Sequence, residues 1–213
     1  MKLYQSVGPN PRVVLFFIAE TGIELDREFV DIRAGDNRTP EWLARNPRGS
    51  MPVLELDDGR MIGESTAICE NLEELYPDPP LVGATAETRA VTRSALRYID
   101  FGVVGPMTNG FRSAEGLPMF QDRMLCVPEA AAGNKSYAQD GLARADHMLA
   151  DSEYLAGDAL TLADIVLFCW TEFGAMVGQP TPDSLTNLSR WRARVAARPA
   201  ATASADPQIG ITA

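Results

Sequence analysis

Up to about residue 80, short apolar stretches alternate between the period of a strand and the period of a helix. Residues 28–32 alternate apolar and polar side chains, which is typical of a half-buried strand. Asp57-Asp58-Gly59 separates two further apolar runs and predicts a tight hairpin turn. The expected order is strand 3–5, helix 11–21, strand 28–32, a short helix at 42–43, strands 53–56 and 60–62, and a helix from about 65 to 75.

The first of these helices has recognisable ends. Asn10 stands where a cap is expected, Pro11 at the first helical position, and Gly22 just past the end. We therefore predict that the Asn10 side chain caps a helix that begins at Pro11.

From Ala84 onward the apolar spacing is helical, over 86–101, 137–149 and 162–173. Thr161 and Asp164 have the spacing of a capping box at the start of the last of these helices. Residues 101–124 contain several glycines and prolines, so we expect this segment to bend or loop.

These patterns predict an α+β first domain with a mixed four-stranded sheet, followed by an all-α second domain. The proline-rich segment 77–83 has the composition of a linker. We expect the domains to cover residues 1–80 and 84–213.

Composition excludes several classes of function. The formal net charge of -10 disfavours binding to nucleic acid and to anionic membrane surfaces. No run approaches the roughly 18 apolar residues of a membrane span, and residues 1–6 do not resemble a secretory signal, so we expect a cytoplasmic protein. Three scattered cysteines and a single histidine predict free thiols and no metal site.

Three motifs, in this order, resemble those of one family. They are Asn46-Pro47-Arg48-Gly49-Ser50-Met51-Pro52-Val53-Leu54, Glu64-Ser65-Thr66-Ala67-Ile68-Cys69-Glu70 and Thr161-Leu162-Ala163-Asp164-Ile165. Together with the expected domain order, they make the chain similar to the cytosolic glutathione transferases over essentially its whole length. The resemblance implies a thioredoxin-like first domain, glutathione as co-substrate, and a homodimer.

The resemblance also implies a glutathione site formed by Ser50, Met51, Pro52, Glu64 and Ser65. A cis peptide bond before Pro52 would present the Met51 backbone to the cysteinyl unit of the tripeptide. Ser65, at a helix N-terminus, would hold the γ-glutamyl carboxylate, and Glu64 the ammonium group. The alternatives are a proline that starts a strand and a simple helix cap beside a solvated acid.

The residue that activates the thiol is less clearly marked. Asn10 aligns with the catalytic cysteine of beta-class members, and Pro9-Asn10 resembles nu-class members. An asparagine amide can donate a hydrogen bond to a thiolate but cannot accept its proton. Asn10 as a plain helix cap is the alternative, and Ser6 and Tyr4 are the other candidates for the catalytic thiol partner.

For the second substrate, a small apolar electrophile, the resemblance points to the helical domain, where Tyr98, Phe101, Met107 and Phe111 are the candidates; packing in the core is their alternative role. The predicted function is glutathione transfer. Glutathione-dependent disulfide or peroxide reduction, aryl-ether cleavage, and ligand binding without catalysis remain open.

Overall fold

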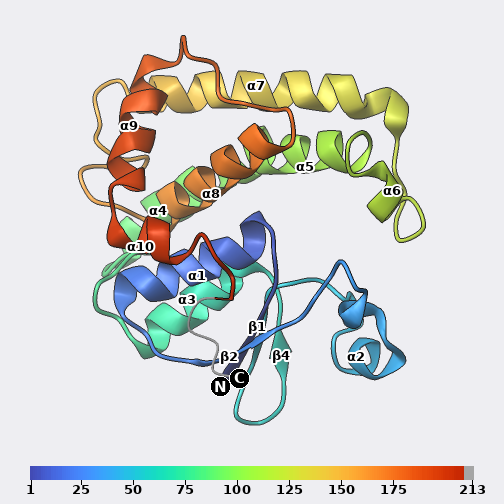
Figure 1. The fold of residues 1–213 in the computed structure, drawn as a ribbon. Helices are drawn as coiled ribbons and strands as arrows, with labels where there is room; N and C mark the ends of the chain where they lie inside the picture. The colour runs from blue at the N-terminus through green and yellow to red at the C-terminus, as the bar shows by residue number, and fades with distance from the viewer. Residues whose placement is uncertain (209–213) are drawn as a thin grey trace. The chain divides into compact units, whose positions relative to one another are not determined.

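The computed structural model describes residues 1–208 and divides them into two compact units. The first unit contains Met1–Leu81 together with residues 196–208, and the second contains Val82–Val195 (Figure 1). Residues 196–208, which the sequence division placed with the helical domain, thus lie with the first unit.

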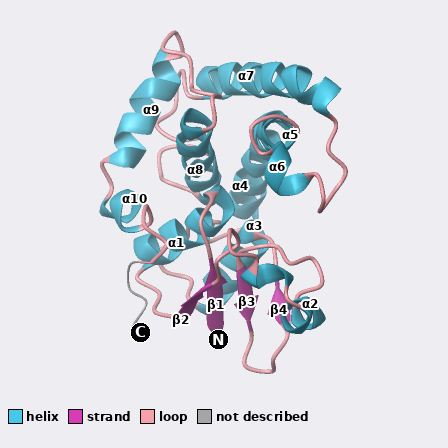
Figure 2. Ribbon diagram, turned by 45° about the vertical axis from the view of Figure 1, so that its right-hand side comes forward, coloured by secondary structure: helices cyan, strands magenta, loops and turns pink. Residues whose placement is uncertain are grey.

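The first unit is built on a four-stranded mixed sheet with the order β2-β1-β3-β4 (Figure 2). The strands are β1 (Lys2–Gln5), β2 (Asp26–Phe29), β3 (Val53–Glu55) and β4 (Met61–Ile62). β1 and β2 are parallel because a helix connects them, whereas β3 pairs antiparallel with both β1 and β4. The predicted mixed sheet is confirmed.

The helices of this unit are α1 (Pro9–Thr21), α2 (Pro40–Arg45), α3 (Ser65–Leu75) and α10 (Pro199–Ala203), with a 3₁₀ turn at Asp36–Arg38. α1 packs against α3 and α10. Glu20 of α1 forms an ion pair with Arg198, and Arg12 donates a hydrogen bond to the carbonyl of Ala201 at 3.3 Å. These contacts explain why the C-terminal residues belong to the first unit.

A small cluster of Tyr4, Val30 and Trp42 is buried between the sheet and α2, with Met51 and Met61 packed against it. The Tyr4 and Trp42 rings meet edge to face with their centroids 5.0 Å apart. This packing fixes the end of α2 and the start of β3, which carry much of the predicted site.

The second unit is helical, with no strand assigned among its described residues. Its helices are α4 (Ala86–Ile99), α5 (Gly105–Arg112), α6 (Leu117–Phe120), α7 (Ala131–Met148), α8 (Leu162–Met176) and α9 (Thr186–Ala196), with a 3₁₀ turn at Pro128–Ala130. The predicted all-α region is confirmed. Within residues 1–208, no helix combines the length and apolarity needed to cross a bilayer.

The segment 101–124, expected to bend or loop, begins as helix and turns only after α5 ends at Arg112. A π-helical turn, Asp100–Val104, connects α4 directly to α5. A Cβ added to Gly141 of α7 would lie 2.0 Å from the carbonyl oxygen of Gly102. The glycines here permit close backbone packing between helices, and Pro106 occupies the first turn of α5, where proline is tolerated.

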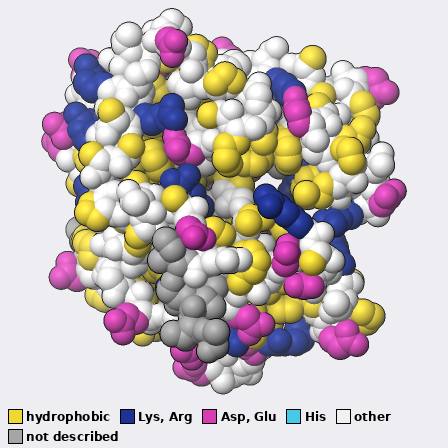
Figure 3. All heavy atoms as spheres, in the orientation of Figure 1, with side chains coloured by type: hydrophobic (Ala, Val, Ile, Leu, Met, Phe, Trp, Pro, Cys, Tyr) yellow, Lys and Arg dark blue, Asp and Glu magenta, His cyan; other side chains and the backbone are white. Residues whose placement is uncertain are grey.

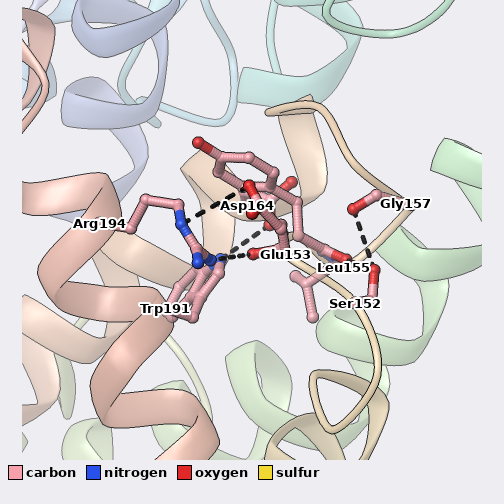
Figure 4. A network of polar contacts seen from close by, with 8 residues as sticks. Ser152, Glu153, Leu155, Gly157, Asp164, Trp191 and Arg194 are labelled. Atoms are coloured by element: carbon pink, nitrogen blue, oxygen red, sulfur yellow. Dashed lines mark hydrogen bonds and ion pairs between the residues drawn. The ribbon is translucent and has the colours of Figure 1, made fainter.

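The capping box at the start of α8 is present and extends into a buried network around Asp164 (Figure 4). Asp164 Oδ2 accepts hydrogen bonds from the amide and hydroxyl of Thr161, at 2.9 and 2.8 Å. Its Oδ1 accepts from the Leu155 amide at 2.9 Å and the Trp191 indole at 2.8 Å. Burial raises the pKa of Asp164, and these donors oppose that rise. One carboxylate therefore ties α8 to α9 and to the preceding loop.

Candidate functional site

The loop before β3 is shaped by two buried asparagines. Asn46, just after α2, donates from its side-chain amide to the carbonyl of Ser50 at 2.9 Å. Its own carbonyl accepts the amide of Gly49 at 2.8 Å. Asn37 donates to the carbonyl of Gly49 at 2.6 Å. These three hydrogen bonds hold the backbone that leads to Met51, whereas the side-chain oxygen of Asn37 is buried without a partner among the described residues.

Gly49 is required by this geometry. It has a φ of 56°, and a Cβ added there would lie 2.7 Å from the carbonyl oxygen of Asn37. Two residues later the Met51–Pro52 peptide bond is cis, as the motif predicted. Met51 is half-buried, Pro52 is buried, and Ser50 is exposed.

Glu64 and Ser65 lie where β4 passes into α3. Ser65 is the first residue of α3 and is half-exposed, so the free amides of the first helical turn lie beside it. Glu64 has a φ of 66°, a conformation in which non-glycine residues are rare and which occurs at ligand-binding sites. The predicted placement of Ser65 at a helix N-terminus agrees with the structure.

Arg48 is a site residue to which sequence reasoning gave no role. Its Nη1 lies 3.1 Å from Glu64 Oε1, and both side chains are largely exposed. An exposed ion pair of this kind contributes about 0–1 kcal/mol. Glu64 can therefore exchange Arg48 for a ligand ammonium group at little cost. A pairing across 16 residues of sequence has no local signal.

Asn10 is not a helix cap, contrary to the prediction. α1 begins at Pro9, with Gly8 as its N-cap at φ 118°, so Asn10 lies inside the first turn. Pro9 and Pro11 have no amide hydrogen, which leaves Asn10 as a backbone donor between them. Its half-buried side-chain amide makes no hydrogen bond to another residue within 1–208. The capping alternative is thereby removed, and the amide is available to a ligand.

Ser6 and Tyr4, the other predicted thiol partners, have hydroxyls that are already engaged. Ser6 is 1% exposed and donates its hydroxyl proton to the carbonyl of Val30 at 2.6 Å. Tyr4 donates to Glu55 Oε2 at 2.8 Å and accepts from Arg45 at 3.2 Å. These bonds hold strand ends and α2 together and leave neither hydroxyl proton free for a sulfur.

Glu55 is the acceptor of the hydrogen bond from the Tyr4 hydroxyl. The hydrogen bonds from Tyr4 and Arg45 lower the pKa of Glu55 below its ordinary value. Arg45 also lies 5.4 Å from the centroid of the Tyr4 ring. The Tyr4 side chain is thus part of a structural charge network on the sheet.

The four predicted electrophile residues do not share one pocket of the helical unit. Tyr98 and Phe101 are mostly exposed and line a cavity of about 300 Å³ together with Tyr137 of α7. Met107 is fully buried against Gly174, because a helix turns by about 100° per residue and places it on another face. Phe111 packs edge to face with Phe173 at 5.1 Å. Their role toward a second substrate stays a prediction.

Within residues 1–208, no group of three or more His, Cys, Asp or Glu side chains is placed to hold a metal ion. In the same described range, Cys69 and Cys169 are buried, Cys126 is half-buried, and none of the three forms a disulfide. In the first unit, the exposed carboxylate of Glu64 and the N-terminus of α3 at Ser65 suit a small organic ligand with ionic ends.

Comparison with known proteins identifies the family of this chain. Residues 7–75 match the model described as "Glutathione S-transferase, N-terminal domain", and residues 130–199 match "Glutathione S-transferase, C-terminal domain". Glutathione S-transferase 2 of Saccharomyces cerevisiae is 32% identical over 199 residues, which cover 90% of this chain and 83% of that protein. The chain belongs to the cytosolic glutathione transferase family.

Solved structures agree with this membership of the glutathione transferase family. A glutathione S-transferase domain-containing protein of Marinobacter aquaeolei VT8 is 36% identical, with a TM-score of 0.88 over 94% of this chain and 99% of that one. β-Etherase LigF of Sphingobium sp. strain SYK-6 is 25% identical, with a TM-score of 0.80 over 95% and 97% of the two chains. The protein is therefore an enzyme of the transferase class.

Proposed function

We propose that this transferase binds glutathione on its first unit and transfers it to a small apolar electrophile. The Met51 backbone pairs with the cysteinyl unit, Ser65 and the amides of α3 hold the γ-glutamyl carboxylate, and Glu64 takes the ammonium group. Asn10 donates to the sulfur. The helical unit supplies the apolar surface for the electrophile.

The observation that carries this proposal is the environment of Asn10. It stands in the first turn of the 13-residue helix α1, where the helix dipole and the backbone amide of Asn10 itself favour an anion. Its side-chain amide is uncommitted within the described chain, whereas the hydroxyl protons of Ser6 and Tyr4 are donated to protein acceptors. Asn10 is thus the best-placed donor for a thiolate among the three candidates.

The chemistry follows from the state of the thiol. A free thiol with a pKa of about 8.5 is only a few per cent thiolate at neutral pH, and the thiolate is the nucleophile. An amide that donates to the sulfur stabilises the thiolate more than the thiol. Each unit by which the thiol pKa falls requires about 1.4 kcal/mol of this difference. Asn10 cannot accept the proton, so the thiol proton passes to water.

Glutathione binding and turnover by the wild-type enzyme test the proposal. Calorimetric titration with glutathione should show saturable binding, and among an aryl halide, a peroxide, a disulfide and an aryl ether, the aryl halide should react fastest. Preference for one of the other three would support the reductive or ether-cleaving alternative. Binding without turnover of any of them would support a ligand-binding protein.

A homodimer and a cytoplasmic location, both expected at the sequence level, also remain proposals. Sedimentation equilibrium should give twice the 23.1 kDa chain mass if the dimer forms. A single species of chain mass would contradict it.

A further inference from the structure

The helical unit contains a row of aromatic side chains that leads from its core to its surface. Trp170 and Phe173 of α8 have ring centroids 5.5 Å apart, and Phe173 lies 5.1 Å from Phe111. Phe111 in turn lies 6.0 Å from Phe120 of α6. Trp170 is buried, whereas Phe111 and Phe120 are half-buried. The outer end of the row therefore offers aromatic faces to a ligand.

Arg112, the last residue of α5, stands at this outer end. Its guanidinium carbon lies 5.1 Å from the centroid of the Phe120 ring. The side chain is half-buried, and burial lowers its pKa below the ordinary value for arginine. A partly desolvated cation is costly unless an anion compensates it.

The protein does not provide that anion within residues 1–208. No ion pair or hydrogen bond joins the Arg112 side chain to another described residue. Glu115, the acid nearest to it in sequence, forms an ion pair with Lys135 of α7. The charge of Cys126 raises the pKa of Arg112 and so opposes the larger effect of burial.

The segment after α6 is anchored beside Arg112 and presents apolar side chains. The Val127 amide donates to Ser113 Oγ, which is buried, at 3.2 Å. Met119, Met124 and Leu125 are exposed. Apolar side chains also reach the surface of the helical unit in the space-filling view (Figure 3). An aromatic wall, apolar side chains and an uncompensated guanidinium together suit an amphipathic ligand.

We propose that Arg112, with the rings of Phe111 and Phe120, forms a subsite of the helical unit for an aromatic second substrate that carries a carboxylate. This inference rests on the proposed function and narrows its electrophile to a molecule with an apolar aromatic ring and one carboxylate. The net charge of -10 repels anions at long range, so recognition of an anionic substrate requires a local cation of this kind. The planar guanidinium can donate two parallel hydrogen bonds to the carboxylate.

Two aryl chlorides provide the test, 4-chloro-3-nitrobenzoate and the neutral 1-chloro-2,4-dinitrobenzene. In both reactions the glutathione sulfur forms a bond to the ring carbon, the carbon–chlorine bond breaks, chloride leaves with the electron pair, and the thiol proton passes to water. Arg112→Met should raise the KM for the benzoate about tenfold or more, and change the KM for the neutral chloride less than about threefold. Arg112→Lys should recover part of the loss.

Arg123→Met is the matched control, because Arg123 is an exposed arginine of the neighbouring segment. It removes the same charge and should change the two KM values by the same small factor. Equal effects of Arg112→Met on both substrates, or an effect on the benzoate no larger than that of Arg123→Met, would overturn the proposal.

Direct binding separates this inference from the proposed function. Fluorescence titration with 8-anilino-1-naphthalenesulfonate reports an aromatic anion without turnover. If the wild type conjugates neither chloride, the proposed function fails; about tenfold weaker dye binding by Arg112→Met than by Arg123→Met would then still support the anionic subsite. Unchanged dye binding would reject it.

Discussion

Replacing Trp191 with phenylalanine should measure how strongly the Asp164 network stabilises the helical unit. Trp191 is 1% exposed, and its indole donates to Asp164 Oδ1 at 2.8 Å. A hydrogen bond to a charged group contributes about 1.5–3 kcal/mol, and the smaller ring forfeits about 1 kcal/mol of apolar burial. The free energy of unfolding should therefore fall by about 2.5–4 kcal/mol.

Trp170→Phe is the matched control for that substitution. Trp170 is 4% exposed, and its indole makes no hydrogen bond to another residue of the described chain. Trp170→Phe should lower the free energy of unfolding by about 1 kcal/mol, which is the loss of apolar burial alone. The assay is urea unfolding at pH 7, followed by circular dichroism, with the slope of free energy against urea required to match the wild type.

A pH series adds a second criterion for the network. Protonation of Asp164 removes the charge that the indole stabilises, so the difference between Trp191→Phe and wild type should shrink as the pH falls through the pKa of Asp164 in the folded protein. Two results would refute the reasoning: equal losses for Trp191→Phe and Trp170→Phe within about 0.5 kcal/mol, or a difference that does not depend on pH.

Two further predictions concern the first unit. Gly49→Ala should weaken glutathione binding about tenfold in calorimetric titration, because its Cβ would lie 2.7 Å from a carbonyl oxygen; Gly63→Ala, where a Cβ meets nothing within 4 Å, should leave binding unchanged. The lowered pKa of Glu55 means that its stabilising contribution is complete above the ordinary glutamate pKa, about 4.3, and disappears as the pH falls through the lower folded value. Thermal unfolding between pH 3 and 7 should show Glu55→Gln less stable than wild type at pH 7 by about 1 kcal/mol, and equal to it at the acid end; a constant difference would contradict this.

Much of the fold could be predicted because local signals agreed with the tertiary structure. The Asp-Asp-Gly turn, the Thr161–Asp164 cap and Gly22 in the left-handed conformation at the end of α1 each carry their own conformational preference. The predicted range of β2 was wrong, because the strand covers Asp26–Phe29 and not residues 28–32. Its limits are set by pairing with β1, whereas Val30 is buried beyond the strand end.

The site was harder to predict where its residues act through space. The Met51–Pro52 and Ser65 placements followed from motifs, but the Arg48–Glu64 pair joins two loops and leaves no pattern in sequence. The start of α1 was predicted at Pro11 because the sequence has a proline on either side of Asn10, and both suit the first helical position. In the structure Gly8 is the N-cap, so Asn10 lies inside the first turn and does not cap the helix.

The pKa of the glutathione thiol in the binary complex tests the central claim most directly. Ultraviolet absorbance of the bound thiolate, titrated with pH, should give a pKa below the free value of about 8.5 for the wild type. Asn10→Ala should raise that pKa by about 1–2 units, as expected for a lost hydrogen bond to a charged group, while Ser6→Ala should leave it unchanged. An unaltered pKa in Asn10→Ala, or an equal rise in Ser6→Ala, would contradict the assignment of Asn10 as the thiolate donor.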